Sequence, residues 1–206
     1  VGFIMLYLMK FDLLTGVFTL VPLALFDKRP GVTPSGVMRN WGLVFVGNFG
    51  GALTTAFLMS FILTYGYSAD GGAIAAKVAS IGESRTLGYQ EHGIGGWITI
   101  FFRGMLCNWM VSMGVVGALI STSAGAKMAA MWMPVMLFFF MGFEHSIVNM
   151  FLFPFSMIMG GDFTVYDYLL WNEIPTVLGN LAGGLLLVGL PLYLTHVRTS
   201  PSRQLA

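Results

Sequence analysis

The sequence predicts an all-α integral membrane protein, from three observations: its composition, its long uncharged segments and an internal repeat. Of its 206 residues, 56% are apolar and only 9% are charged, against about 25% charged in a typical soluble domain. A surface with so few charged side chains is better suited to contact with lipid than with water. The net charge is +1 and no basic run is present, so no nucleic-acid partner is expected.

Three segments are long, apolar and almost free of charge. They are residues 41–69, 93–126 and 174–195, and Arg103 is the one charged residue among them. A helix needs about 20 apolar residues to cross the ~30 Å hydrocarbon layer. Each segment is therefore predicted to span the membrane.

Two further apolar segments, 1–26 and 128–161, are interrupted by ionisable residues. The interruptions are Lys10 and Asp12 in the first and Glu144 and His145 in the second. As one straight helix, the second would be about 51 Å long, too long for a bilayer. We therefore predict five spans in this chain, of which the first and the fourth are broken helices.

Basic residues outside these spans lie mostly on one side. Six belong to that side: Lys28, Arg29, Arg39, Lys127, Arg198 and Arg203. The other side has two, Lys77 and Arg85, among acidic residues that include Glu173. Cytoplasmic loops carry the excess of Lys and Arg, which predicts a cytoplasmic C-terminus and a multi-pass protein of the cell inner membrane.

Landmark residues recur at a constant offset of 132 residues. The pairs are Phe11-Asp12 with Phe143-Glu144, Pro22 with Pro154, Asn40 with Asn172, Gly47-Asn48 with Gly179-Asn180, and Gly51 with Gly183. Three spans, an odd number, separate equivalent elements, so the two copies should run in opposite directions through the membrane. Inverted repeats are typical of transporters, whose substrate sites lie near the midplane at discontinuous helices.

The repeat predicts a single transmembrane domain. Its parts are a first copy at about 1–69, a second at about 92–197 and a cytoplasmic tail at 198–206. The counterpart of the span 93–126 would precede Val1, so we expect one missing first helix and three plus three helices in the full protein. Glycines four apart, as in Gly179 and Gly183, are expected to allow close helix packing.

Ionisable groups inside a membrane cost at least ~2.5–3.5 kcal/mol each and are candidates for function. Asp12 and Glu144 are repeat equivalents at the two breaks. We expect each carboxylate to cap the half-helix that follows, with direct proton handling as the alternative. Lys10 and Arg103 are expected either to attract anions, to pair with these carboxylates or to face a neighbouring subunit.

His145 has no histidine counterpart in the first copy, where Leu13 stands. A lone histidine in an apolar segment is usually a core residue, but its place at a helix break favours function. There it could respond to pH or pass a proton to an anion. Thr15 follows the other break, and pseudo-symmetry predicts that its hydroxyl binds His145 or an anion oxygen.

Other chemistries lack the residues they require. The sequence contains no His/Cys/Glu cluster with metal-ligand spacing, no nucleophile elbow and no phosphate-binding loop. We therefore expect no metal, no cofactor and no enzymatic activity. Two alternatives stay open: an aquaporin-like channel for small neutral solutes, and a membrane anchor without transport.

Several segments resemble the formate–nitrite transporter family, in the right order and over essentially the whole chain. They are Gly142-Phe-Glu-His-Ser-Ile-Val-Asn-Met150, Cys107-Asn-Trp-Met-Val111, Asp12-Leu-Leu-Thr-Gly16, Arg39-Asn-Trp41 with Gly47-Asn48, and Ile174-Pro175 with Gly179-Asn180. The resemblance implies an aquaporin-like six-helix protomer in a homopentamer, with one pore per protomer.

The resemblance also implies roles for individual residues. His145 would be the central pore histidine, Thr15 its hydroxyl partner and Asn108 a polar residue near the pore. Leu13, Phe138 and Phe3 would form apolar constrictions. The implied substrates are small monovalent anions, formate first and nitrite second. They would cross together with a proton, because a dry constriction excludes a charged carboxylate. The protein would contact the lipid bilayer.

Overall fold

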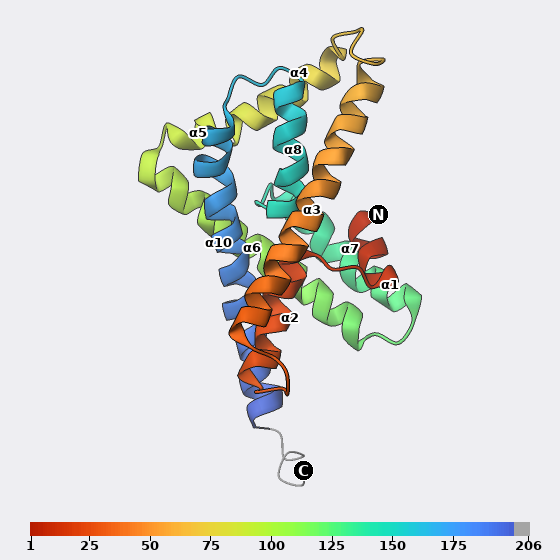
Figure 1. Cartoon of the computed structure of the whole chain (residues 1–206), viewed down its shortest axis with the longest axis vertical. Coiled ribbons are helices and arrows are strands. Elements are labelled where there is room, and N and C mark those ends of the chain that lie inside the picture. The colour runs from red at the N-terminus through yellow and green to blue at the C-terminus, as the bar shows by residue number, and fades with distance from the viewer. Residues whose placement is uncertain (200–206) are drawn as a thin grey trace. The chain divides into compact units, whose positions relative to one another are not determined.

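The computed structural model describes residues 1–199, and every regular element in that range is helical (Figure 1). The α-helices are α1 (Gly2–Met9), α2 (Leu14–Phe26), α3 (Pro34–Leu63), α4 (Gly72–Ser84), α5 (Leu87–Gln90), α6 (Gly93–Ile120), α7 (Ala124–Phe140), α8 (Ser146–Ile158), α9 (Val165–Tyr168), α10 (Ile174–Gly184) and α11 (Leu190–Leu192). Three π-helical stretches, η1 (Leu169–Glu173), η2 (Leu185–Gly189) and η3 (Tyr193–Arg198), alternate with α10 and α11. Arg203 and most of the predicted tail lie outside the described residues.

Among residues 1–199, four helical segments are long and apolar enough to cross a membrane: Gly2–Phe26, Pro34–Leu63, Gly93–Ile120 and Val165–Arg198. The fourth predicted span corresponds to two shorter apolar helices, α7 and α8. The predicted all-α membrane fold is therefore confirmed. One boundary differs: the helical segment that contains the last predicted span begins at Val165, so Glu173 lies within this segment rather than in a loop.

Both predicted helix breaks are present. Between α1 and α2, Lys10 has φ 60° and Leu13 is extended, with φ −119° and ψ 131°. Between α7 and α8, Gly142 has φ 62° and His145 is extended, with φ −121° and ψ 116°. The half-helices that follow, α2 and α8, each have 13 residues. Their first residues are separated by the same 132-residue offset as the sequence landmarks.

The described residues form two compact units. The first unit contains Val1–Phe45, Met105–Phe143 and the chain from Asn180 onward. Its core includes Val111, Val115 and Phe138. Within it α1 packs along α7 (Figure 1), and the rings of Phe3 and Phe138 meet edge to face at 5.8 Å.

The second unit contains Val46–Gly104 and Glu144–Gly179. Within it α4, a helix that the sequence did not predict, packs along α8 (Figure 1). A side chain at Gly82 would collide with Ser156, so a glycine is needed where the two helices approach. The hydroxyl of Ser156 donates to the carbonyl of Ala79 at 3.2 Å.

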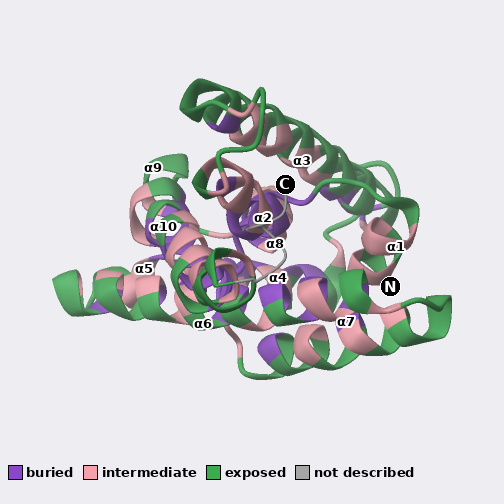
Figure 2. Ribbon diagram, turned by 90° about the horizontal axis from the view of Figure 1, so that it is seen from below, coloured by how far each residue is buried: buried purple, intermediate pink, exposed green. Residues whose placement is uncertain are grey.

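Much of the helical surface is apolar and exposed. Figure 2 shows α3 exposed along most of its length, whereas α2 contains a group of buried residues. Exposed residues of α3 include Leu43, Val46, Leu58 and Phe61. Such a surface suits lipid or a neighbouring subunit.

Candidate functional site

His145 occupies the N-cap of α8 and is only 1% exposed. Its Nδ1 accepts a hydrogen bond from the backbone N–H of Val148 at 3.3 Å. In a neutral imidazole one ring nitrogen accepts and the other carries the hydrogen. With Nδ1 as the acceptor, the neutral ring therefore carries its hydrogen on Nε2.

The N-cap residues differ from the expectation. Asp12 and Glu144 were expected to cap the half-helices, but the N-caps are Leu13 and His145, one residue later. The chain stays extended through these positions, which moves each helix start by one residue. Leu13 makes no side-chain cap hydrogen bond, whereas the ring of His145 does.

Glu144 is fully buried in the second unit and is held by donors from other segments. Arg85 Nε lies 3.3 Å from its Oε1, and the hydroxyl of Tyr89 donates to the same oxygen at 3.4 Å. On Oε2 it accepts from Asn149 Nδ2 at 3.0 Å and Asn172 Nδ2 at 3.3 Å. A carboxylate that remains ionised when buried requires both a counter-ion and hydrogen bonds, and Glu144 has both.

The donors around Glu144 are themselves connected. Asn149 Nδ2 also donates to Asn172 Oδ1 at 2.7 Å, and Asn172 Nδ2 donates to the carbonyl of Arg85 at 2.9 Å. Arg103 Nη1 donates to the hydroxyl of Tyr89 at 2.8 Å. Of the partners considered for Arg103, the structure thus places it next to Glu144, through Tyr89. These bonds fix the backbone that precedes His145.

Glu173 is a second buried carboxylate of the same unit, 4% exposed, at the end of η1. Its Oε1 accepts from the hydroxyl of Ser146, the first residue of α8. Its Oε2 accepts from the hydroxyl of Tyr168 at 2.9 Å. Neither the Asp27–Arg29 pair nor the Arg85–Glu144 pair involves Glu173.

Asn108 is the centre of a buried polar group in the first unit. Its Nδ2 donates to the carbonyl of Thr15 at 3.0 Å and to that of Asn180 at 2.6 Å. Ser112 Oγ lies 3.4 Å from Asn108 Oδ1 and 2.6 Å from Thr19 Oγ1. Asn108 therefore ties α6 to the first turn of α2 and to α10.

The predicted apolar residues also lie in the first unit. Leu13 is 5% exposed and Phe138 is 1% exposed, while Phe3 is partly buried against the same core. Thr15 is fully buried in the first turn of α2. The predicted residues are thus divided: Phe3, Leu13, Thr15, Asn108 and Phe138 lie in the first unit, and His145 lies in the second.

Five residues of the second unit were missed as site residues: Arg85, Tyr89, Asn149, Asn172 and Glu173. Arg85 and Glu173 were assigned to loops because each adjoins an apolar segment without interrupting it. Asn172 carried a usable signal, since it is the repeat counterpart of Asn40. Asn149 also carried one, since it lies five residues from Glu144 within the family-like segment Gly142–Met150. Tyr89 carried none, because Glu144 is distant from it in the sequence.

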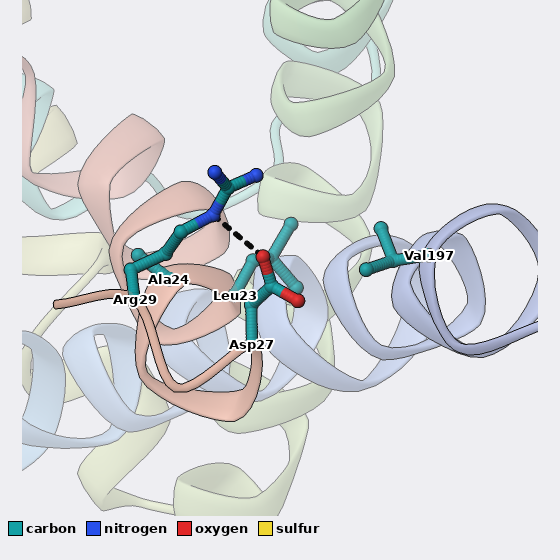
Figure 3. A pocket seen from close by; sticks show the side chains of 5 residues that line it. All are labelled: Leu23, Ala24, Asp27, Arg29 and Val197. Atoms are coloured by element: carbon teal, nitrogen blue, oxygen red, sulfur yellow. Dashed lines mark ion pairs between the residues drawn. The ribbon is translucent and has the colours of Figure 1, made fainter. Parts of the chain in front are cut away.

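A separate cavity of about 220 Å³ lies in the first unit, where α2 ends. Figure 3 shows its lining, Leu23, Ala24, Asp27, Arg29 and Val197, with the Asp27–Arg29 ion pair at 2.6 Å. None of the predicted site residues lines it. Among residues 1–199, no cluster of His, Cys, Asp and Glu could hold a metal ion.

The chain is similar in sequence to known membrane transporters. The sequence profile of the Formate/nitrite transporter family matches residues 1–194. The chain belongs to this family. A "Probable formate transporter" of Methanothermobacter thermautotrophicus is 31% identical over 203 residues, covering 96% of this chain and 73% of that protein. The "Formate channel FocA" of Escherichia coli is 31% identical, covering 88% and 67%.

A solved structure shares the fold of this transporter-family chain. It is described as a "Pentameric formate channel with formate bound", and it matches with a TM-score of 0.74 at 26% identity. The match covers 94% of this chain and 78% of that one. The resemblance read from the sequence is thereby confirmed. The chain is a multi-pass membrane protein of an anion-transporting family.

Proposed function

We propose that the protein carries small monovalent anions across the membrane, formate first and nitrite second, with proton-linked neutralisation at His145. The observation that carries this proposal is a fully desolvated histidine at the N-cap of a half-helix. Its Nδ1 is engaged by the Val148 N–H, so the neutral ring can offer only its Nε2–H to an anion oxygen.

The position of His145 suits an anion for a second reason. The N-terminus of α8 carries a partial positive charge and points its first N–H groups along the helix axis. An anion entering an apolar path loses most of its hydration, which costs many kcal/mol unless the charge is neutralised. A proton taken up from the aqueous phase together with the anion neutralises it near His145, while the ring stays neutral and donates its Nε2–H, so the anion continues as a neutral acid.

Other residues of both units have supporting roles in this proposal. Arg85 balances the charge of Glu144, so the backbone before His145 is held without adding a net negative charge that would repel an anion. Thr15 and Asn108 are proposed to offer polar contacts to the anion. Leu13, Phe138 and Phe3 are proposed to restrict the path to ions that have shed water.

Assembly and orientation are also proposed. A structural relative is titled a pentameric formate channel, and the exposed apolar residues of α3 suit subunit contacts as well as lipid. We therefore propose a homopentamer. The excess of basic residues on one side supports an inner-membrane location with a cytoplasmic C-terminus.

The direct test is uptake of labelled formate by proteoliposomes of the full-length protein, at several external pH values. Wild type should show protein-dependent uptake that increases on acidification, and His145→Phe should abolish it. His196→Phe, at an exposed position, is the matched control and should transport normally. Absence of flux for formate, nitrite and hydrosulfide alike would contradict the proposal and favour a neutral-solute channel.

A further inference from the structure

In the second unit, two buried carboxylates contact or adjoin the start of α8, and they differ in the kind of group that binds them. Glu144 precedes His145 and pairs with Arg85 at 3.3 Å. Glu173 contacts the residue that follows His145, through the hydroxyl of Ser146. Its other oxygen accepts from Tyr168 at 2.9 Å, again a hydroxyl. One carboxylate thus has a cationic partner, and the other is held by neutral donors.

We propose that Glu173 is a second proton-binding residue of the transporter, which takes up a proton when an anion occupies the site at His145. The inference rests on the proposed function and deepens it. It assigns part of the proton coupling to a residue other than the histidine. The new site is the carboxylate of Glu173, and the species that it binds is a proton.

Glu173 lies close enough to His145 for its charge to interact with an anion bound at the histidine. Consecutive Cα atoms are about 3.8 Å apart, and Ser146, which donates to Glu173, directly follows His145. The carboxylate is therefore on the order of 10 Å from the imidazole. Charges at such a separation interact strongly in a desolvated environment, where screening by water and salt is weak.

The sign of this coupling follows from the charges. An ionised Glu173 repels an anion near His145, whereas a protonated Glu173 does not. Anion binding must therefore favour proton binding at Glu173, and proton binding must favour the anion to the same extent. The anion and the proton then enter as an electrically neutral pair.

Other groups near Glu173 do not replace it in this role. The charged and titratable side chains on the segments around η1 include Arg85, Tyr89, Glu144, His145, Asp167 and Tyr168, and Arg103 donates to the hydroxyl of Tyr89. Arg85 balances the charge of Glu144, and the hydroxyl of Tyr89 donates a hydrogen bond to the same carboxylate. Asp167 is partly buried, and its carboxylate accepts a hydrogen bond from the hydroxyl of Thr164. Tyr168 donates to Glu173 and so responds to its charge.

The hydrogen bonds of Glu173 allow both protonation states. When it is ionised, Ser146 and Tyr168 each donate to one carboxylate oxygen. When it is protonated, its own O–H can donate to either hydroxyl oxygen, because a hydroxyl both donates and accepts. The change therefore requires only hydroxyl rotation.

The test compares formate flux against pH in proteoliposomes of the full-length wild type and the Glu173→Gln variant. The Gln side chain mimics the neutral carboxyl group. We expect wild-type flux to fall from acidic to neutral pH, and the variant to keep about tenfold more flux than wild type at the high-pH end. Glu173→Asp should retain the wild-type response, and Glu91→Gln, which alters an exposed carboxylate, should change nothing.

Parallel pH profiles of wild type and Glu173→Gln would overturn this inference while leaving anion transport established. Absence of flux in the wild type would instead overturn the proposed function. If the Gln variant does not assemble, Tyr168→Phe provides an independent test. That variant removes one donor from the ionised carboxylate, so the midpoint of the flux–pH curve must move to higher pH, and an unmoved midpoint would refute the proposal.

Discussion

Arg85 Nε lies 3.3 Å from Oε1 of Glu144, a carboxylate that is fully buried. The two residues are far apart in the sequence, and their pairing fixes the end of the break that precedes α8. The ion pair is reinforced by hydrogen bonds from Tyr89, Asn149 and Asn172. Removing one member of such a pair is more harmful than removing both, because a lone buried charge remains.

The first prediction follows from this pair. Arg85→Ala should destabilise the protein by about 3–5 kcal/mol, the cost of an uncompensated buried charge. The double variant Arg85→Ala/Glu144→Gln should recover part of that loss. Thermal unfolding of the detergent-solubilised protein measures both. A double variant no more stable than Arg85→Ala would show that the charge of Glu144 is balanced in another way.

The second prediction concerns Gly184, where a side chain has no room. A Cβ added there would collide with Thr19 Oγ1 and lie 2.6 Å from Asn108 Nδ2. Gly184→Ala should therefore displace Asn108, lowering both thermal stability and formate flux. Gly95→Ala is the matched control, because its Cβ would meet nothing within 4 Å. Equal behaviour of the two variants would mean that α10 shifts without cost.

The third prediction concerns Asn108, whose amide donates to two backbone carbonyls. Asn108→Leu leaves the carbonyls of Thr15 and Asn180 without this donor in a buried environment, at about 1–3 kcal/mol for each unsatisfied group. Stability should fall markedly, by thermal unfolding. Ser112→Ala removes a 3.4 Å contact to Asn108 and a 2.6 Å hydrogen bond to the Thr19 hydroxyl. Its effect should be smaller, because the Thr19 hydroxyl can rotate, whereas the two carbonyls cannot. A larger loss in the Ser112 variant would contradict this ranking.

The broken helices could be predicted from the sequence because the signal is local and doubled. Charged residues interrupt two apolar segments, and the landmarks of both copies keep one offset. The structure reproduces that offset in α2 and α8. This signal locates a break but does not identify the N-cap residue, which lies one residue later than expected at both breaks.

For one of the glycines the structure shows what packs against it. A side chain at Gly183 would collide with the carbonyl oxygen of Met105, as close helix packing requires. At Gly47 and Gly51 a Cβ would meet nothing within 4 Å in the described part of the chain. Spacing alone reveals a face of small residues, but it does not identify what packs against that face.

The environment of Glu144 could not be read from the sequence. Its donors come from the segment after α4, from α5, from α8 and from η1, and only the folded chain brings them together. Arg85 was counted as a loop charge because it lies between helices. Hydropathy describes each segment separately, so it could not show that this arginine balances a carboxylate in another segment.

The fourth prediction tests whether Thr15 and His145 act on the same anion. Thr15→Val keeps the shape of the side chain but removes its hydroxyl, so formate flux should fall by about tenfold, the effect of losing one hydrogen bond. Thr15→Ser should retain most of the flux. If both residues contact one anion, the losses in Thr15→Val and His145→Asn should not add in the double variant, because contacts to a shared partner are coupled. Initial rates of formate uptake by wild type and all the variants are measured at one fixed pH. Strictly additive losses would assign the two residues to separate steps of transport.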